Sequence, residues 1–73
     1  MSGIANYEKL ANAIILQAVK DYRTAGQKLK KKSTNHMAQA DMESIERFFR
    51  SPWYGCLTEV DGEMLIRKLR EEA

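Results

Sequence analysis

The stretch that decides the fold is IERFFRSPWYGCLTEVDGEMLIRKL, which spans Ile45 to Leu69. It holds both phenylalanines and the only tryptophan, proline and cysteine of the 73-residue chain. Pro52 ends a preceding helix, because the residue before a proline is pushed out of the α region. Ser51 followed by Pro52 is also typical of a helix start, with an N-cap and then proline at the first helical position. The stretch therefore predicts a helix ending near Arg50, a short helical turn through Cys56, and a further helix.

Helical periodicity continues on the N-terminal side of this stretch. Apolar residues from Tyr7 to Tyr22 recur at the i, i+3, i+4 and i+7 spacing, which predicts a helix beginning near Ile4 to Asn6 and running past Tyr22. Gly26 is either a left-handed cap or an interior residue that costs about 1 kcal/mol. Leu29 falls on the same face as Tyr22, which favours continuation of the helix to Lys31.

Two more helices follow from capping signals. A polar loop at Ser33 to Asn35 offers N-cap residues for a helix that we expect from His36 or Met37 to Arg50. The last helix is expected from about Glu59 to Glu72, with Thr58 as its N-cap and Asp61 completing a variant of the capping box.

No segment shows the strict alternation of a half-buried strand. We therefore predict an all-α fold, a compact three-helix domain with a short extra helical turn between helices 2 and 3, and residues 1–73 as a single helical domain. A monomer of this size buries only about 60% of its unfolded surface, which favours a partner subunit. Leu16, with part of Ile15 and Val19, is the predicted subunit interface. The expected core consists of Leu10, Ile14, Ala18, Ile45, Phe48, Phe49, Leu57, Leu65 and Leu69.

Composition narrows the class of protein. Twelve basic and ten acidic residues leave a formal net charge of +2, which is too small to imply a polyanionic partner. Cys56 is the only cysteine, so an intramolecular disulfide is excluded. The uncharged run from Leu10 to Val19 is about half of the roughly 20 apolar residues that a membrane span needs. With no secretory signal in the sequence, we expect a cytoplasmic protein that has no membrane partner.

Two patterns that suggest a metal or catalytic site fail on spacing. The Asp61-Gly62 pair is similar to the centre of a calcium loop, but aligning that glycine with the loop glycine places Leu57 and Lys68 at ligand positions. Cys56 and His36 lie on different predicted elements, and no third group orients them. We therefore predict a protein that is not an enzyme and has no metal, no cofactor and no small-molecule substrate.

Three segments, NAIILQAVKDYR (Asn12 to Arg23), IERFFRSPWYGCLTEVDGE (Ile45 to Glu63) and LIRKLREE (Leu65 to Glu72), resemble a group of small uncharacterised proteins. That group belongs to phages and integrated mobile elements of Firmicutes. The resemblance covers most of the chain except the region from Ala25 to Ala40. It implies a context, mobile DNA in a bacterial cytoplasm, and carries no activity or binding residue onto this sequence.

The aromatic corner is the first candidate for a binding surface. Trp53 and Tyr54 are flanked by Arg47 and Arg50, which is the composition of protein-interface anchors. The leading prediction is a non-catalytic accessory protein of a mobile element that docks onto another protein or onto itself as a homodimer. Its partner-binding residues would be Trp53, Tyr54, Arg47, Arg50 and Leu16.

A basic run is the second candidate. Lys28, Lys30, Lys31 and Lys32 precede small hydroxyl and amide residues, and such side chains are the ones that contact phosphates. The alternative function is therefore an accessory or regulatory DNA-binding protein. The ordinary explanation of the run is a solvated helix end, where lysines complement the helix dipole.

Overall fold

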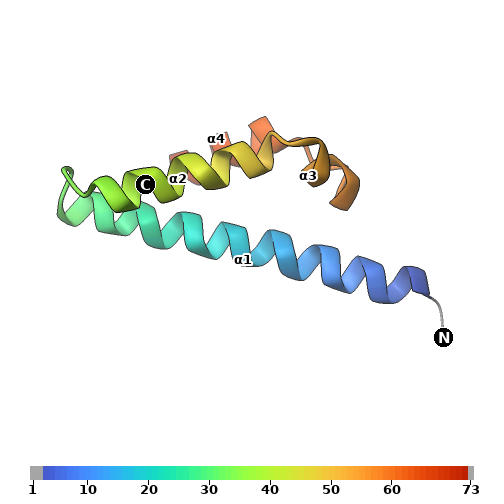
Figure 1. Cartoon of the computed structure of the whole chain (residues 1–73). Helices are drawn as coiled ribbons and strands as arrows, with labels where there is room; N and C mark the ends of the chain where they lie inside the picture. Colours follow the sequence, from blue (N-terminus) through green and yellow to red (C-terminus); the bar gives the residue numbers. More distant parts are fainter. Residues whose placement is uncertain (1–2, 73) are drawn as a thin grey trace.

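The computed structural model describes residues 3–72, and this part of the chain is helical with no strand. The helices are α1 (Gly3–Lys31), α2 (His36–Phe49), α3 (Pro52–Leu57) and α4 (Gly62–Glu71). The predicted all-α fold, with three main helices and a short extra one before the last, is confirmed (Figure 1).

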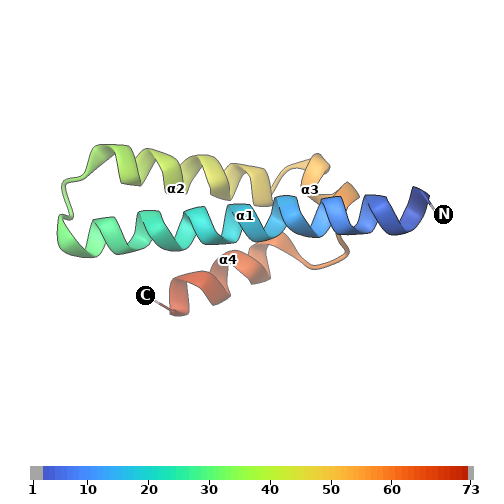
Figure 2. The same ribbon diagram turned by 90° about the horizontal axis from the view of Figure 1, so that it is seen from below.

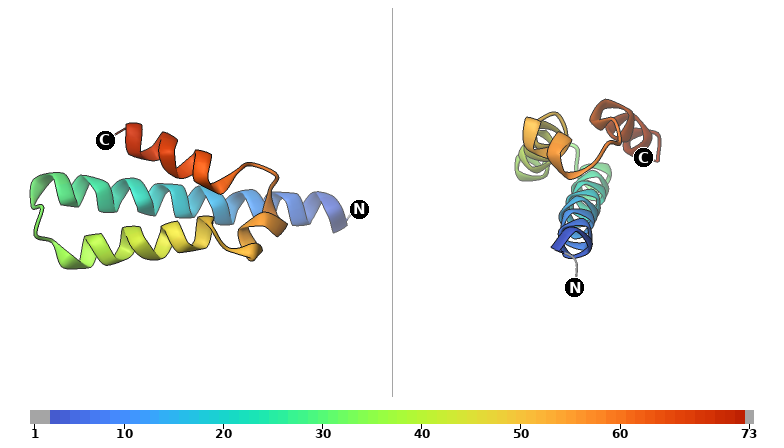
Figure 3. Two further views of the ribbon diagram at one scale, coloured as in Figure 1. Left: turned by 90° about the horizontal axis from the view of Figure 1, so that it is seen from above. Right: turned by 90° about the vertical axis from the view of Figure 1, so that its right-hand side faces the viewer.

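The three long helices pack side by side. α2 runs antiparallel to α1, and α4 runs in the same direction as α1 (Figure 2). α4 contacts both α1 and α2. Seen along the long axis, the three form a triangle, with α1 at one corner and both other helices on the same side of it (Figure 3). The 29 residues of α1 span about 43 Å at 1.5 Å per residue, roughly twice the length of α2. The molecule is therefore elongated, with extents of 48 × 20 × 19 Å.

α1 passes through Gly26 without interruption. It begins at Gly3, next to the predicted start at Ile4 to Asn6, and ends at Lys31. The predicted continuation past Gly26 is confirmed, and Leu29 beyond it is half-buried. Packing of the buried side chains of α1 stabilises the helical conformation at Gly26, and this stabilisation outweighs the poor helix propensity of glycine.

Local caps set the starts of α2 and α3 as predicted. Asn35 caps α2, its side-chain oxygen accepting a hydrogen bond from the Ala38 N–H at 3.0 Å. Ser51 caps α3 by accepting from the Tyr54 N–H at 3.2 Å, and Pro52 is the first residue of that helix. These contacts lie within three residues of each cap, which explains why sequence signals located them.

The start of α4 differs from the prediction. Thr58 is the extended C-cap of α3, and its hydroxyl accepts from the Val60 N–H at 3.2 Å. The N-cap of α4 is Asp61, whose carboxylate accepts from the Glu63 N–H at 3.2 Å. The predicted start at Glu59 is wrong, because the Thr58 hydroxyl closes a local turn there instead of capping a helix.

The core is an aromatic and aliphatic cluster between α1, α2 and α4. Two of the predicted core residues, Phe49 and Leu69, are buried, and Ala18, Ile45 and Phe48 pack partly buried against them. Leu65 packs there in the same way, while Ile14 and Leu57 are half-buried. The fully packed cluster consists of Val19, Tyr22, Phe49, Tyr54, Ile66 and Leu69.

Two predictions on α1 are corrected. Leu10 is 61% exposed and lies outside the core, because it faces away from the other helices, and the next residue, Ala11, is the one that turns inward. Val19 is buried in the core cluster and Ile15 packs against it, so neither is available for the predicted subunit interface. Leu16 is 66% exposed, so it is the one residue of the three that is accessible to a second subunit.

Candidate functional site

α3 presents Trp53 at the end of the molecule. The Ser51 cap and Pro52 hold the start of this one-turn-and-a-half helix, and Trp53 is its second residue. The indole packs edge-on against Phe48, with ring centroids 5.3 Å apart and planes at 69°. More than half of the residue, 58%, nevertheless remains exposed. Trp53 is thus supported on one side and open to solvent on the other.

Tyr54 has the opposite placement. It is only 3% exposed, and its ring makes edge contacts with Phe48 and Phe49 at centroid distances of 5.8 and 5.6 Å. Burial, together with the negative charge of Asp61, raises the pKa of its phenol above the ordinary value. Within residues 3–72 the buried hydroxyl has no hydrogen-bond partner. The structure therefore removes Tyr54 from the partner-binding set, because its ring is part of the core.

The two arginines of the predicted set also differ. Arg50 donates two hydrogen bonds to the Glu63 carboxylate and approaches Glu46 at 3.7 Å, so it ties the end of α2 to α4. The hydrogen bond from Arg50 holds the pKa of Glu63 below its ordinary value. Arg47 is exposed in the last turn of α2, next to Phe48. Arg47 is therefore the arginine of the predicted set that forms no ion pair within residues 3–72.

A buried carboxylate connects the three long helices. Glu46 of α2 is 9% exposed and accepts a 2.5 Å hydrogen bond from the Tyr22 hydroxyl of α1. Both of its oxygens accept from the Arg70 guanidinium of α4, at 2.9 and 3.0 Å. Burial, and then the hydrogen bond to Glu46, raises the pKa of Tyr22. Sequence reasoning missed Glu46, although it lies four residues after Met42 and three before Phe49, on the apolar stripe of α2.

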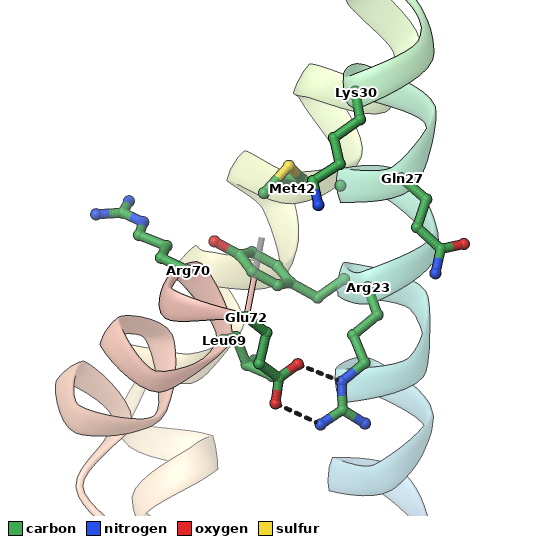
Figure 4. A pocket seen from close by; sticks show the side chains of 9 residues that line it. Arg23, Gln27, Lys30, Met42, Leu69, Arg70 and Glu72 are labelled. Carbon is green, nitrogen blue, oxygen red and sulfur yellow. Dashed lines mark hydrogen bonds and ion pairs between the residues drawn. The ribbon is translucent and has the colours of Figure 1, made fainter.

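A groove of about 230 Å³ opens where α4 ends and α1 and α2 continue (Figure 4). The Arg23–Glu72 ion pair, at 2.8 Å, closes one end of it and Lys30 lies at the other. Ligand pockets usually measure about 300–1,000 Å³, so this space suits one side chain of a protein rather than a small-molecule substrate. Its lining consists of Tyr22, Arg23, Gly26, Gln27, Lys30, Met42, Leu69, Arg70 and Glu72.

The basic run does not form a one-sided patch. Lys28 lines a shallow depression between α1 and α2 that also contains Asp21 and Asp41. Lys30 lines the groove on the opposite side of α1. Successive helical residues are rotated by about 100°, so Lys31 lies about 60° from Lys28 around the helix, and Lys32 follows the end of the helix. All four lysines are exposed, but the run spreads its charge around the helix end.

Residues 3–72 show no metal or membrane site. No group of three His, Cys, Asp or Glu side chains in this range is placed to hold a metal ion. No helix in the same range is both long and apolar enough to cross a membrane. His36 begins α2, whereas the exposed Cys56 lies in α3, past the other end of α2. The pair is therefore not brought together.

These features define a small all-α protein. A third helix packs along the hairpin of α1 and α2, and a tryptophan is exposed on the short helix α3. Comparisons of the chain with protein-family models, curated proteins and solved structures find no match. The resemblance to the small proteins of mobile elements stays a prediction.

Proposed function

We propose that this chain is a non-catalytic protein-interaction protein that docks onto another protein through Trp53. The observation that carries this proposal is the tryptophan itself, 58% exposed on α3 and held by Phe48. Tryptophan is among the residues most enriched in the energetic centres of protein interfaces. Arginine is enriched in these centres too, and Arg47 is exposed one residue before Phe48.

The support beneath Trp53 favours an anchor over a loose surface side chain. An aromatic side chain has only two torsion angles to restrict, and packing against Phe48 at 5.3 Å already restricts them. A partner that covers the free face of the indole therefore loses little side-chain entropy on binding. The resemblance described under Sequence analysis implies a protein that is encoded by a mobile element and docks in a bacterial cytoplasm.

Replacing Trp53 with photo-reactive benzoylphenylalanine is expected to yield one discrete protein adduct in the cells that encode this chain. The matched control places the same group at Met37, which is 80% exposed on the first turn of α2. Mass spectrometry of the adducts is the measurement. Excess wild-type protein should compete the Trp53 adduct away, whereas excess Trp53→Ala protein should not.

Equal labelling at both positions, or a Trp53 adduct that excess Trp53→Ala protein also competes away, would contradict docking at Trp53. The competitor must be folded for this comparison. The Trp53→Ala protein should remain folded, because an aromatic pair contributes only about 0.5–1.5 kcal/mol beyond its buried area. Circular dichroism of the variant is the check.

Nucleic-acid binding is the second candidate, favoured by one observation. Lys28, Lys30, Lys31 and Lys32 are exposed, and none of them forms an ion pair with another residue in the range 3–72. If they contact phosphates, mobility shifts of a DNA duplex or single strand should weaken steeply with salt through counterion release. Lys30→Glu with Lys31→Glu should then abolish the shift. A salt-independent shift, or none at low salt, would exclude this function.

A further inference from the structure

A ten-residue run in the middle of α1 carries no ionisable side chain. The run LANAIILQAV, from Leu10 to Val19, makes nearly three helical turns without an ionisable residue. A helix that is hydrophobic all round is normally buried on all sides, and the only polar side chains in this run are Asn12 and Gln17. In this chain, however, only one side of the run is covered, where Ala11 and Val19 are buried.

The uncovered side is an apolar face of α1. Leu10 is 61% and Leu16 66% exposed, and Ala13 lies exposed between them at the i, i+3, i+6 spacing. The view along the long axis shows that both α2 and α4 lie on the same side of α1 (Figure 3). The opposite side of α1 meets no other segment of residues 3–72 (Figure 1). We call Leu10, Ala13, Leu16 and Gln17 the outer face of α1.

The elongated molecule exposes more surface than a compact monomer of the same mass. The accessible surface is 5532 Å², whereas a compact monomer of 8.4 kDa is expected to expose about 4,600 Å². The excess of about 900 Å² is close to the roughly 800 Å² that each partner contributes to a standard protein interface. The uncovered side of α1 contributes to this excess, and a second copy of the chain offers an equally long helix that could cover it.

We propose that two copies associate through the outer faces of α1, packed antiparallel about a two-fold axis at Ala13. In this register Leu10 of one copy meets Leu16 of the other, twice in each dimer, as an isologous interface requires. The small Ala13 side chain lets the two helices approach closely at the crossing point. Lys9 comes opposite Gln17 of the second copy and Lys20 opposite Asn6, so that no two lysines are paired directly. The pairing is additional to docking at Trp53 and independent of it.

The oligomeric state tests this pairing directly. Sedimentation equilibrium of the full chain should give twice the monomer mass of 8.4 kDa. Leu10→Glu and Leu16→Lys should each raise the dimer dissociation constant by at least about 100-fold, because an ionised side chain would be buried against a leucine twice per dimer. Mixing the two variants should restore a dimer, since the antiparallel register then brings the new glutamate against the new lysine.

The controls separate this interface from other outcomes. Met37→Glu and Trp53→Ala should dimerise like the wild type, and circular dichroism should show that Leu10→Glu and Leu16→Lys are folded, since both positions are exposed. A wild-type mass of 8.4 kDa at millimolar concentration would overturn the proposal. Dimerisation that survives both charged variants would also overturn it. Failure of the mixture to dimerise would overturn the antiparallel register.

Discussion

Gly62→Ala is expected to destabilise the protein by about 3 kcal/mol or more, at the upper end of the range for overpacked sites. A β-carbon at Gly62 would overlap the Phe49 carbonyl oxygen and lie 2.9 Å from the carbonyl carbon. Both atoms belong to the backbone at the end of α2, so they cannot rotate away. The start of α4 would have to move from α2, drawing Ile66 and Leu69 away from the core.

The other glycines provide matched controls. An added β-carbon at Gly26 or Gly55 would meet no atom within 4 Å, and neither residue has a positive φ. Gly26→Ala should therefore stabilise the protein by about 1 kcal/mol, since it replaces an interior glycine of α1. The measurement is the urea midpoint, followed by helical circular dichroism. A Gly62→Ala variant as stable as the wild type would show that α4 does not approach α2 so closely.

Glu46→Ala is expected to cost about 3 kcal/mol, the second large effect. The substitution leaves the buried Tyr22 hydroxyl without its acceptor and removes both hydrogen bonds from Arg70. A buried polar group left unpaired costs about 1–3 kcal/mol, and lost bonds to a charged group add to this. Because Glu46 contacts α1 and α4 at once, the loss should appear in the stability of the whole domain.

Glu43→Ala is the matched control, since Glu43 is an exposed acid on the same helix. Surface changes of this kind usually stay within about 0.5 kcal/mol. A double-mutant cycle with Tyr22→Phe should show a coupling between Tyr22 and Glu46 of about 1 kcal/mol or more. Equal stabilities for Glu46→Ala and Glu43→Ala would contradict a stabilising role for the buried carboxylate.

The aromatic corner shows why a candidate site could be only half predicted. Trp53 and Tyr54 are neighbours with similar side chains, and the sequence offered no means of ranking their exposure. A helix rotates successive residues by about 100°, so one turned outward while the other entered the core. Arg50 likewise is held by Glu63, which lies thirteen residues later and is brought beside it only by the tertiary fold.

Local sequence determined the secondary structure, and it did so because the contacts that start and end helices join residues only a few positions apart. Asn35, Ser51 and Pro52 act on their immediate neighbours, and their signals located α2 and α3. Burial was decided by tertiary structure. Glu46 became a core residue because Tyr22 and Arg70, each 24 residues away, converge on it and compensate for its loss of water. Leu10 became exposed because it lies on the side of α1 that faces away from α2 and α4, and no local pattern records on which side those helices pack.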